Sequence, residues 1–408
     1  MERIGIYGGT YNPPHVGHMR AAAHAIEALK LDRLLLIPNN IAPHKQMPED
    51  AATAQQRMDM LRMSAKGLEK TEILDLELQR DGKSYTSDTV TQIRKIYPEG
   101  ELFLLMGTDM FLNFLTWHEY RTISDQVTLA VFYRGERGEQ EAVCRQQERL
   151  EEMGIRVVRI CNPVTAISST DLRRMLIFGC ADPYLCPGVG DYIRAQGLYD
   201  TGRDYKNLPM DALEETVVKL LKENRVAHVL GCRDAAVELA RQYGENEVDA
   251  ARAGLLHDIT KALDGPLQLT LCSEYDILLS KFSQENPKTL HALTGSLVAE
   301  QVFGENQAVV TAIRYHTTGR PAMSRLEKIL YLADYIEANR NFPGVDRLRA
   351  AAHRSLDEGM LMGLEMTLSQ LREQKRQISQ NSIDAARYLR EQGVRLEDET
   401  TTLQPEGL

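Results

Sequence analysis

Three glycines, two adjacent prolines and two histidines stand together near the start of the chain, in the stretch GGTYNPPHVGH from Gly8 to His18. The stretch follows the apolar run Ile4 to Tyr7, so it predicts a loop between a first strand and a helix that begins near His18 or Met19. In doubly wound folds this turn presents backbone N–H groups and a positive helix end to phosphate. His15 and His18 could donate hydrogen bonds to charge developing on phosphorus-bound oxygens. The alternative is a structural turn with surface histidines, since the spacing fits neither the dinucleotide-binding nor the P-loop fingerprint.

A second group of residues that could do chemistry lies in the second half of the chain, one residue or pair per expected helix. Its members are His228, His257, Asp258, His291, His316 and Asp334. Any one of these histidines alone could be a packed core residue. Together they resemble ligands that a helical bundle points into its centre. The segments GLLHDI and YLAD also place carboxylates among apolar residues, which is costly unless the carboxylates are paired or metal-bound.

The elements that must position these residues change in kind near residue 200. Before that point β-like runs alternate with helical patterns (RIGIYG, RAAAHAIEALK, RLLLIP, ELFLLMG, VTLAVFYR, IRVVRI), which predicts an α/β domain with a largely parallel sheet. After it, helical periodicity dominates, with stops at Gly244, at Asp264-Gly265-Pro266 and at Gly304. We expect a domain over residues 1–200, a linker over 201–210, an all-α domain over 211–395 and a disordered tail over 396–408.

Size and composition narrow the class of protein. A chain of 408 residues is long enough for two domains with separate cores. The net charge of -10 disfavours nucleic acid as a main partner. The six cysteines include no Cys-x-x-Cys pair, which is typical of reduced thiols. There is no apolar leader and no run of membrane-spanning length, so we expect a cytoplasmic protein with no membrane partner.

The opening loop resembles the signature of the nucleotidyltransferases whose HxGH motif binds ATP, and its full form is similar to that of the nicotinate mononucleotide adenylyltransferases. Further stretches agree in order along the first 200 residues: IPNNIAPHKQ, KSYTSDT, LLMGTDMFLNFLTWHEY and ISSTDLRR. KSYTSDT is expected to form a loop that carries Tyr85, Thr86 and Asp88. A lone HxGH would also suggest class I aminoacyl-tRNA synthetases or phosphopantetheine adenylyltransferases.

This resemblance implies roles in adenylyl transfer for individual residues. His15, His18 and Arg173 are the expected catalytic residues. Mg²⁺ is expected to accompany ATP. The expected ATP- and substrate-binding residues are Gly8, Gly9, Thr10, Lys45, Tyr85, Thr86, Gly107, Asp109, Trp117, Ser168 and Ser169. Trp117 would stack on the pyridine ring, with a core aromatic as the alternative. His24, His118 and His353 match no motif and are interpreted as ordinary helix or surface residues.

The histidines and aspartates of the second half resemble the ligand motif of the HD-domain metallophosphohydrolases. The stretches LLHDITK, HTTGR and LADYIEANR are similar to those of the enzymes in this family that cleave diadenosine tetraphosphate symmetrically. The resemblance implies one ion held by His228, His257, Asp258 and Asp334 and a second, bridged through Asp258, held by His291 and His316. Ligands of this type without thiolate fit transition metals better than magnesium, with iron preferred and manganese or zinc as alternatives. Asp258 would be catalytic, and Lys261 and Arg320 would neutralise the polyphosphate.

Together these resemblances imply an α/β Rossmann-like nucleotidyltransferase domain followed by an all-α HD-domain helical bundle. The expected enzyme is bifunctional: it makes nicotinic acid adenine dinucleotide from ATP and nicotinate mononucleotide, and it hydrolyses diadenosine tetraphosphate to two ADP. Its partners would be these nucleotides, and a homo-oligomer is left open. The alternatives are nicotinamide mononucleotide or phosphopantetheine as substrate of the first half. For the HD half they are another nucleotide, such as a guanosine polyphosphate or a cyclic dinucleotide, or a role as a nucleotide sensor.

Overall fold

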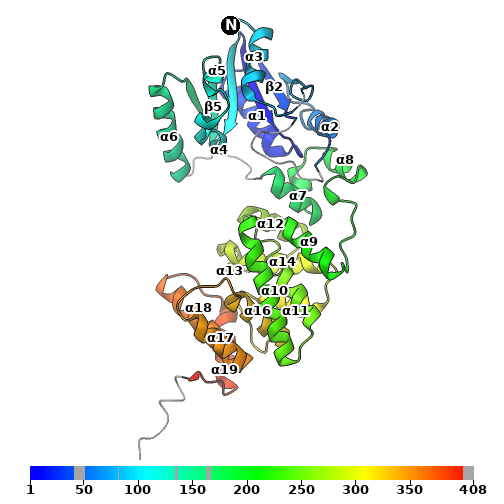
Figure 1. Ribbon diagram of the computed structural model, residues 1–408, viewed down its shortest axis with the longest axis vertical. Helices are drawn as coiled ribbons and strands as arrows, with labels where there is room; N and C mark the ends of the chain where they lie inside the picture. The colour runs from blue at the N-terminus through cyan, green and yellow to red at the C-terminus, as the bar shows by residue number, and fades with distance from the viewer. Residues whose placement is uncertain (41–50, 81, 134–136, 162–166, 398–408) are drawn as a thin grey trace, which may run out of the picture. The chain divides into compact units, whose positions relative to one another are not determined.

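The computed structural model describes residues 1–40, 51–80, 82–133, 137–161 and 167–397. The chain divides into two compact units, Met1–Arg203 and Asp204–Leu408 (Figure 1). In the described part of the chain, every helix is too short or too polar to cross a membrane.

The first unit is built on a six-stranded parallel sheet with the order β3-β2-β1-β4-β5-β6. The strands are β1 Arg3–Gly9, β2 Arg33–Pro38, β3 Thr71–Ile73, β4 Glu101–Gly107, β5 Thr128–Tyr133 and β6 Val157–Cys161. The helices are α1 Val16–Ala28, α2 Ala54–Ser64, α3 Thr86–Ile96, α4 Thr108–Leu112, α5 Tyr120–Ser124, α6 Arg137–Glu152, α7 Ser169–Ile177 and α8 Val189–Ala195, with short 3-10 turns at Phe114–Thr116, Asp182–Tyr184 and Leu198–Asp200. The sheet is the doubly wound one that the alternating pattern predicts.

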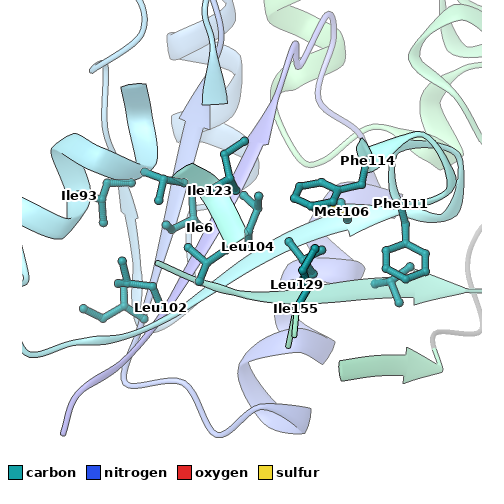
Figure 2. Close-up of a cluster of buried hydrophobic side chains, with 14 of the residues drawn as sticks. Ile6, Ile93, Leu102, Leu104, Met106, Phe111, Phe114, Ile123, Leu129 and Ile155 are labelled. Carbon is teal, nitrogen blue, oxygen red and sulfur yellow. The ribbon is translucent and has the colours of Figure 1, made fainter. Parts of the chain in front are cut away.

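Both faces of this sheet are buried, because successive side chains along a strand point to opposite sides. On β4, Leu104 packs into one core cluster with side chains of α3, α4, α5 and α6, whereas Phe103 and Leu105 pack into another with α1 and α2. Figure 2 shows the first cluster, with Ile6 and Leu129 beside Leu104. The near-continuous apolar runs of the sequence thus reflect two-sided burial.

The second unit is helical, and its described residues contain no strand. Its helices are α9 Met210–Leu220, α10 Glu223–Tyr243, α11 Glu247–Leu256, α12 Gly265–Glu274, α13 Lys281–Glu285, α14 Leu290–Gln301, α15 Gln307–Tyr315, α16 Arg325–Ile336, α17 Val345–Arg354, α18 Leu356–Glu373 and α19 Gln380–Glu391, with a 3-10 turn at Pro287–Thr289. Gly244 ends α10 with a φ of 67°, the left-handed conformation that glycine adopts most easily.

Some expected elements differ in detail from those observed. The helix after the opening loop begins at Val16, earlier than expected. The prediction that KSYTSDT forms a loop is wrong beyond Tyr85, because Thr86 and Asp88 lie in the first turn of α3. The short strand β3 has no counterpart in the sequence prediction. The predicted disordered tail lies outside the described residues from 398 onward.

Candidate functional site

A cleft of about 1080 Å³ opens at the carboxyl ends of β1 and β4, where strand order reverses and doubly wound folds bind their ligands. It brings together nearly all the residues predicted for adenylyl transfer. Its lining includes Gly8, Gly9, Thr10, His15, His18, Tyr85, Thr86, Gly107, Asp109, Trp117, Ser168, Ser169 and Arg173. Lys45, the remaining predicted residue, lies outside the described residues.

The two histidines of the opening loop form a reciprocal cap at the start of α1. The backbone N–H of His18 donates to Nδ1 of His15 over 3.3 Å, and the backbone N–H of His15 donates to Nδ1 of His18 over 3.2 Å. The rings are stacked with their centroids 3.6 Å apart. Because both Nδ1 atoms accept, each ring carries its hydrogen on Nε2. Burial lowers the pKa of His15 to about 4, so this ring is neutral at pH 7.

Helix α7 places Arg173 beside this loop. Its guanidinium donates to the carbonyl of Asn12 over 2.7 Å, and the hydroxyl of Ser169 donates to the carbonyl of Pro13 over 3.0 Å. Ser168 caps the helix by accepting from the backbone N–H of Asp171. The cleft therefore has a histidine pair and an arginine, together with the positive ends of α1 and α7.

An aromatic group lines another part of the cleft. Trp117 packs against Phe114 of the core, with ring centroids 5.6 Å apart, and also lines the cavity. Both interpretations of Trp117 therefore describe part of its environment. His118, which matched no motif, lies against Tyr85 with ring centroids 4.4 Å apart and also faces the cleft. Its position beside the tryptophan in the sequence was the signal that could have identified it.

Sequence reasoning missed two buried charged residues near the cleft. Arg57 on α2 is 2% exposed and donates to the carbonyl of Thr10 over 2.7 Å. Burial lowers its pKa. Glu77 lines the cleft and accepts a hydrogen bond from Thr89 over 2.7 Å, and burial raises its pKa. Neither residue belongs to a local pattern that marks it, because only the fold brings it to the site.

The second unit gathers all six predicted metal ligands into one buried cluster. They come from α10, the ends of α11 and α15, α14 and α16. The Nε2 atoms of the four histidines lie 3.4 Å (His291), 3.6 Å (His257), 3.8 Å (His228) and 3.9 Å (His316) from carboxylate oxygens of Asp258. Asp334 lies 3.2 Å from Nε2 of His228. Two sets, His228 with His257 and Asp334, and His257 with Asp258 and His316, have donor atoms within 4.8 Å of one another.

The histidine hydrogen bonds test whether this cluster fits a cation. Nδ1 of His257, His291 and His316 donates to the carbonyls of Gly254, Lys288 and Ile313, at 2.7, 2.8 and 2.6 Å. Nε2 of each ring is therefore the lone-pair atom, the arrangement usual for metal-ligating histidine.

Two further observations on the same rings agree with a bound cation. Nε2 of His316 is buried and has no hydrogen-bond partner among the described residues. Burial lowers the pKa of all three histidines, that of His316 to about 4, so the rings are neutral at pH 7 and each Nε2 atom carries a lone pair. The residues fit divalent metal ions.

In the described part of the chain, three positively charged side chains lie against the cluster, and two of them, Arg225 and Arg340, were not predicted. Arg225 pairs with Asp258 and Arg340 with Asp334. Lys261, predicted to meet polyphosphate, donates to Nε2 of His291 over 2.8 Å, and burial lowers its pKa to about 8.

Arg320, the other residue predicted to meet polyphosphate, is engaged elsewhere. It forms a two-pronged pair with the buried Glu327, at 2.6 and 2.9 Å. It also lies over the ring of Tyr315. The pair with Glu327 belongs to the N-terminal cap of α16, so the structure gives Arg320 a part in starting that helix.

Comparison with known families agrees with this division of the chain. The cytidylyltransferase-like family matches residues 6–175 and the HD domain family matches residues 225–339, so a nucleotidyltransferase domain is joined here to an HD domain with a divalent-metal site. A Dictyoglomus thermophilum protein named "Probable nicotinate-nucleotide adenylyltransferase" is 34% identical over 198 residues, which are 48% of this chain and 99% of that protein. A Thermus thermophilus protein of the same name is 37% identical over the same shares. Through its first half the chain belongs to the nicotinate-nucleotide adenylyltransferase family.

One solved structure also resembles the chain. It is a predicted HD superfamily hydrolase involved in NAD metabolism from Clostridium acetobutylicum, 39% identical in sequence. The match covers 45% of this chain and 98% of that one, with a TM-score of 0.44.

Proposed function

We propose that the first unit transfers AMP from ATP to nicotinate mononucleotide, releasing pyrophosphate. The observation that carries this proposal is the cleft that combines a histidine pair, Arg173 and an aromatic subsite. The acceptor's 5′-phosphate is largely ionised at pH 7, because its second pKa is about 6, so no protein base is needed. The protein has to align two anions and stabilise the charge on the transferring phosphorus.

The side chains divide this work between the two substrates. The Nε2–H groups of His15 and His18 would donate to the triphosphate of MgATP, with Gly8, Gly9 and Thr10 offering backbone contacts. Ser168, Ser169 and Arg173 would hold the phosphates from the other side, and Lys45 is a further phosphate ligand. Asp109, in the first turn of α4 just after β4 ends at Gly107, would accept from a ribose hydroxyl. Trp117 would stack on the pyridine ring, with Tyr85 and Thr86 near its carboxylate.

A substrate panel tests this assignment. Full-length protein is incubated with MgATP and nicotinate mononucleotide, nicotinamide mononucleotide or phosphopantetheine, and pyrophosphate release is followed. We expect the largest kcat/KM with nicotinate mononucleotide. A preference for either other acceptor would contradict the substrate assignment, and no release with any acceptor would contradict adenylyl transfer itself.

We further propose that the second unit is a metal-dependent hydrolase that splits diadenosine tetraphosphate into two ADP. The supporting observation is the set of four inward-facing histidines around Asp258. Bound divalent cations would supply an acidified water and neutralise phosphoryl charge. Asp258 would orient both halves of the ligand set, and Lys261 would meet the polyphosphate. Iron is the metal that we favour, with manganese and zinc as alternatives.

Metal analysis combined with a nucleotide panel tests this second proposal. Protein purified with and without oxygen is analysed for iron, manganese and zinc and then assayed on diadenosine tetraphosphate, a guanosine polyphosphate and a cyclic dinucleotide. We expect ADP as the only product from the first substrate. Cleavage of another nucleotide alone would contradict the substrate, and metal binding without hydrolysis of any nucleotide would favour a sensor.

A further inference from the structure

Glu337 is a buried carboxylate next to the metal-ligand cluster, immediately after the last residue of α16. It is 1% exposed and accepts a hydrogen bond from Nδ1–H of His228 over 3.2 Å. The backbone N–H and the side-chain amide of Asn339 also donate to it, over 2.6 and 2.9 Å. Three donors thus hold the carboxylate in place, and its own position in turn fixes the ring of His228.

His228 differs in this respect from the other three histidines of the cluster. Their Nδ1–H groups donate to backbone carbonyls, whereas that of His228 donates to a carboxylate. A carboxylate on Nδ1–H raises the basicity of Nε2, the atom that binds the metal. Nε2 of His228 lies 3.2 Å from Asp334 and 3.3 Å from Nε2 of His257, so it points to the centre of the ligand set.

The helix that carries His228 leaves room for this carboxylate. Gly231 lies one turn along α10, and a Cβ atom there would be 2.5 Å from Oε2 of Glu337. Any side chain at this position would displace the carboxylate. Glycine at residue 231 leaves space for the carboxylate, and the three donors hold the carboxylate against His228. These two observations are independent of each other.

We propose that Glu337 is a positioning residue that orients His228 and strengthens its bond to the metal. The inference rests on the metal site of the proposed hydrolase. Glu337 hydrogen-bonds one member of the ligand set, His228, over 3.2 Å, and its nearest charged neighbour, Arg340, is farther away at 4.0 Å. Replacing its carboxylate with an amide should therefore weaken metal binding without removing a metal ligand.

The test measures Mn²⁺ binding to the full-length protein after chelator treatment, following free Mn²⁺ by electron paramagnetic resonance. We expect Glu337→Gln to raise the Kd for Mn²⁺ by about 10- to 100-fold, the usual effect of losing such an outer partner. Gly231→Ala should raise the Kd as well, although alanine favours the helix. In a His228→Ala background, Glu337→Gln should change the Kd by less than about twofold, since its effect passes through that ring.

Glu327→Gln is the matched control, because Glu327 is equally buried, in the first turn of α16. Among the described residues it bonds Arg320 and Ser324 and no histidine. It should alter thermal stability and leave the Kd for Mn²⁺ within about twofold of the native value. Equal affinity of Glu337→Gln and native protein, or a full additive loss in the His228→Ala background, would overturn the inference. If the native protein binds no Mn²⁺, the proposed metal site fails as a whole. Circular dichroism and the thermal unfolding of the second unit check that each variant is folded. If Glu337→Gln does not fold, the Kd of Gly231→Ala tests the inference in its place.

Discussion

Replacing His18 separates the two things that its ring does in the structure. Nδ1 accepts the backbone N–H of His15 and helps to cap α1, while Nε2 carries the hydrogen that we propose donates to phosphate. Removing one preorganised donor to a developing oxyanion lowers kcat by roughly 100- to 1,000-fold, or about 3 to 4 kcal/mol. Losing the cap hydrogen bond costs about 1 kcal/mol of stability, which a folded domain tolerates. We therefore expect His18→Ala to lower kcat for adenylyl transfer at least 100-fold, with a smaller change in ATP affinity.

Two further variants at the same position distinguish the cap from the donor. The Oδ1 atom of asparagine can take the place of Nδ1, so His18→Asn should restore stability but not kcat. The amide of glutamine reaches the position of Nε2, so His18→Gln should recover part of kcat. The assay measures pyrophosphate release at saturating substrates, with ATP binding by calorimetry and melting temperature alongside. Turnover of His18→Ala within a few-fold of the native enzyme would refute the donor role.

Four further predictions address the other features. Trp117→Ala should raise KM for the mononucleotide by about 5- to 150-fold, from a stacking energy of roughly 1 to 3 kcal/mol; an unfolded variant would instead show that its packing in the core dominates. Asp258→Ala should abolish hydrolysis and spare adenylyl transfer, and a parallel loss of both activities in a protein with native circular dichroism would show that the sites are coupled. Burial lowers the pKa of His15 from 6.5 to about 4, so protonation favours the unfolded chain. The free energy of unfolding should therefore be unaffected by this residue above pH 6.5 and should fall by about 3 kcal/mol as the pH falls to 4. Denaturant unfolding of His15→Asn, whose cap does not titrate, should lack that decline. Fragments 1–203 and 206–408 should each fold and keep one activity; aggregation of either, seen by light scattering, would argue against independent folding.

The local parts of both sites could be predicted from the sequence. His15 and His18 belong to one loop, so their spacing in the chain nearly fixes their spacing in space. The same holds for Ser168 and Arg173 at the start of one helix. Alternating apolar runs predicted the parallel sheet, because a strand buried on both faces needs an almost unbroken apolar sequence. The ligand set of the second unit stood out because Asp258 and Asp334 place carboxylates in apolar surroundings, where charged groups rarely occur.

Tertiary structure decided which distant residues support these groups. Arg57 and Glu337 are ordinary helix-region residues in the sequence, and only packing brings one to the carbonyl of Thr10 and the other to His228. Arg320 is predicted from the sequence to neutralise polyphosphate, and only the fold shows that it also pairs with Glu327. Partners separated by many residues leave no periodic signal, because the free energy that joins them comes from the folded core and not from local geometry. The sequence by itself therefore indicated the candidate reacting groups, and the fold determined their orientation, their tautomers and their neighbours.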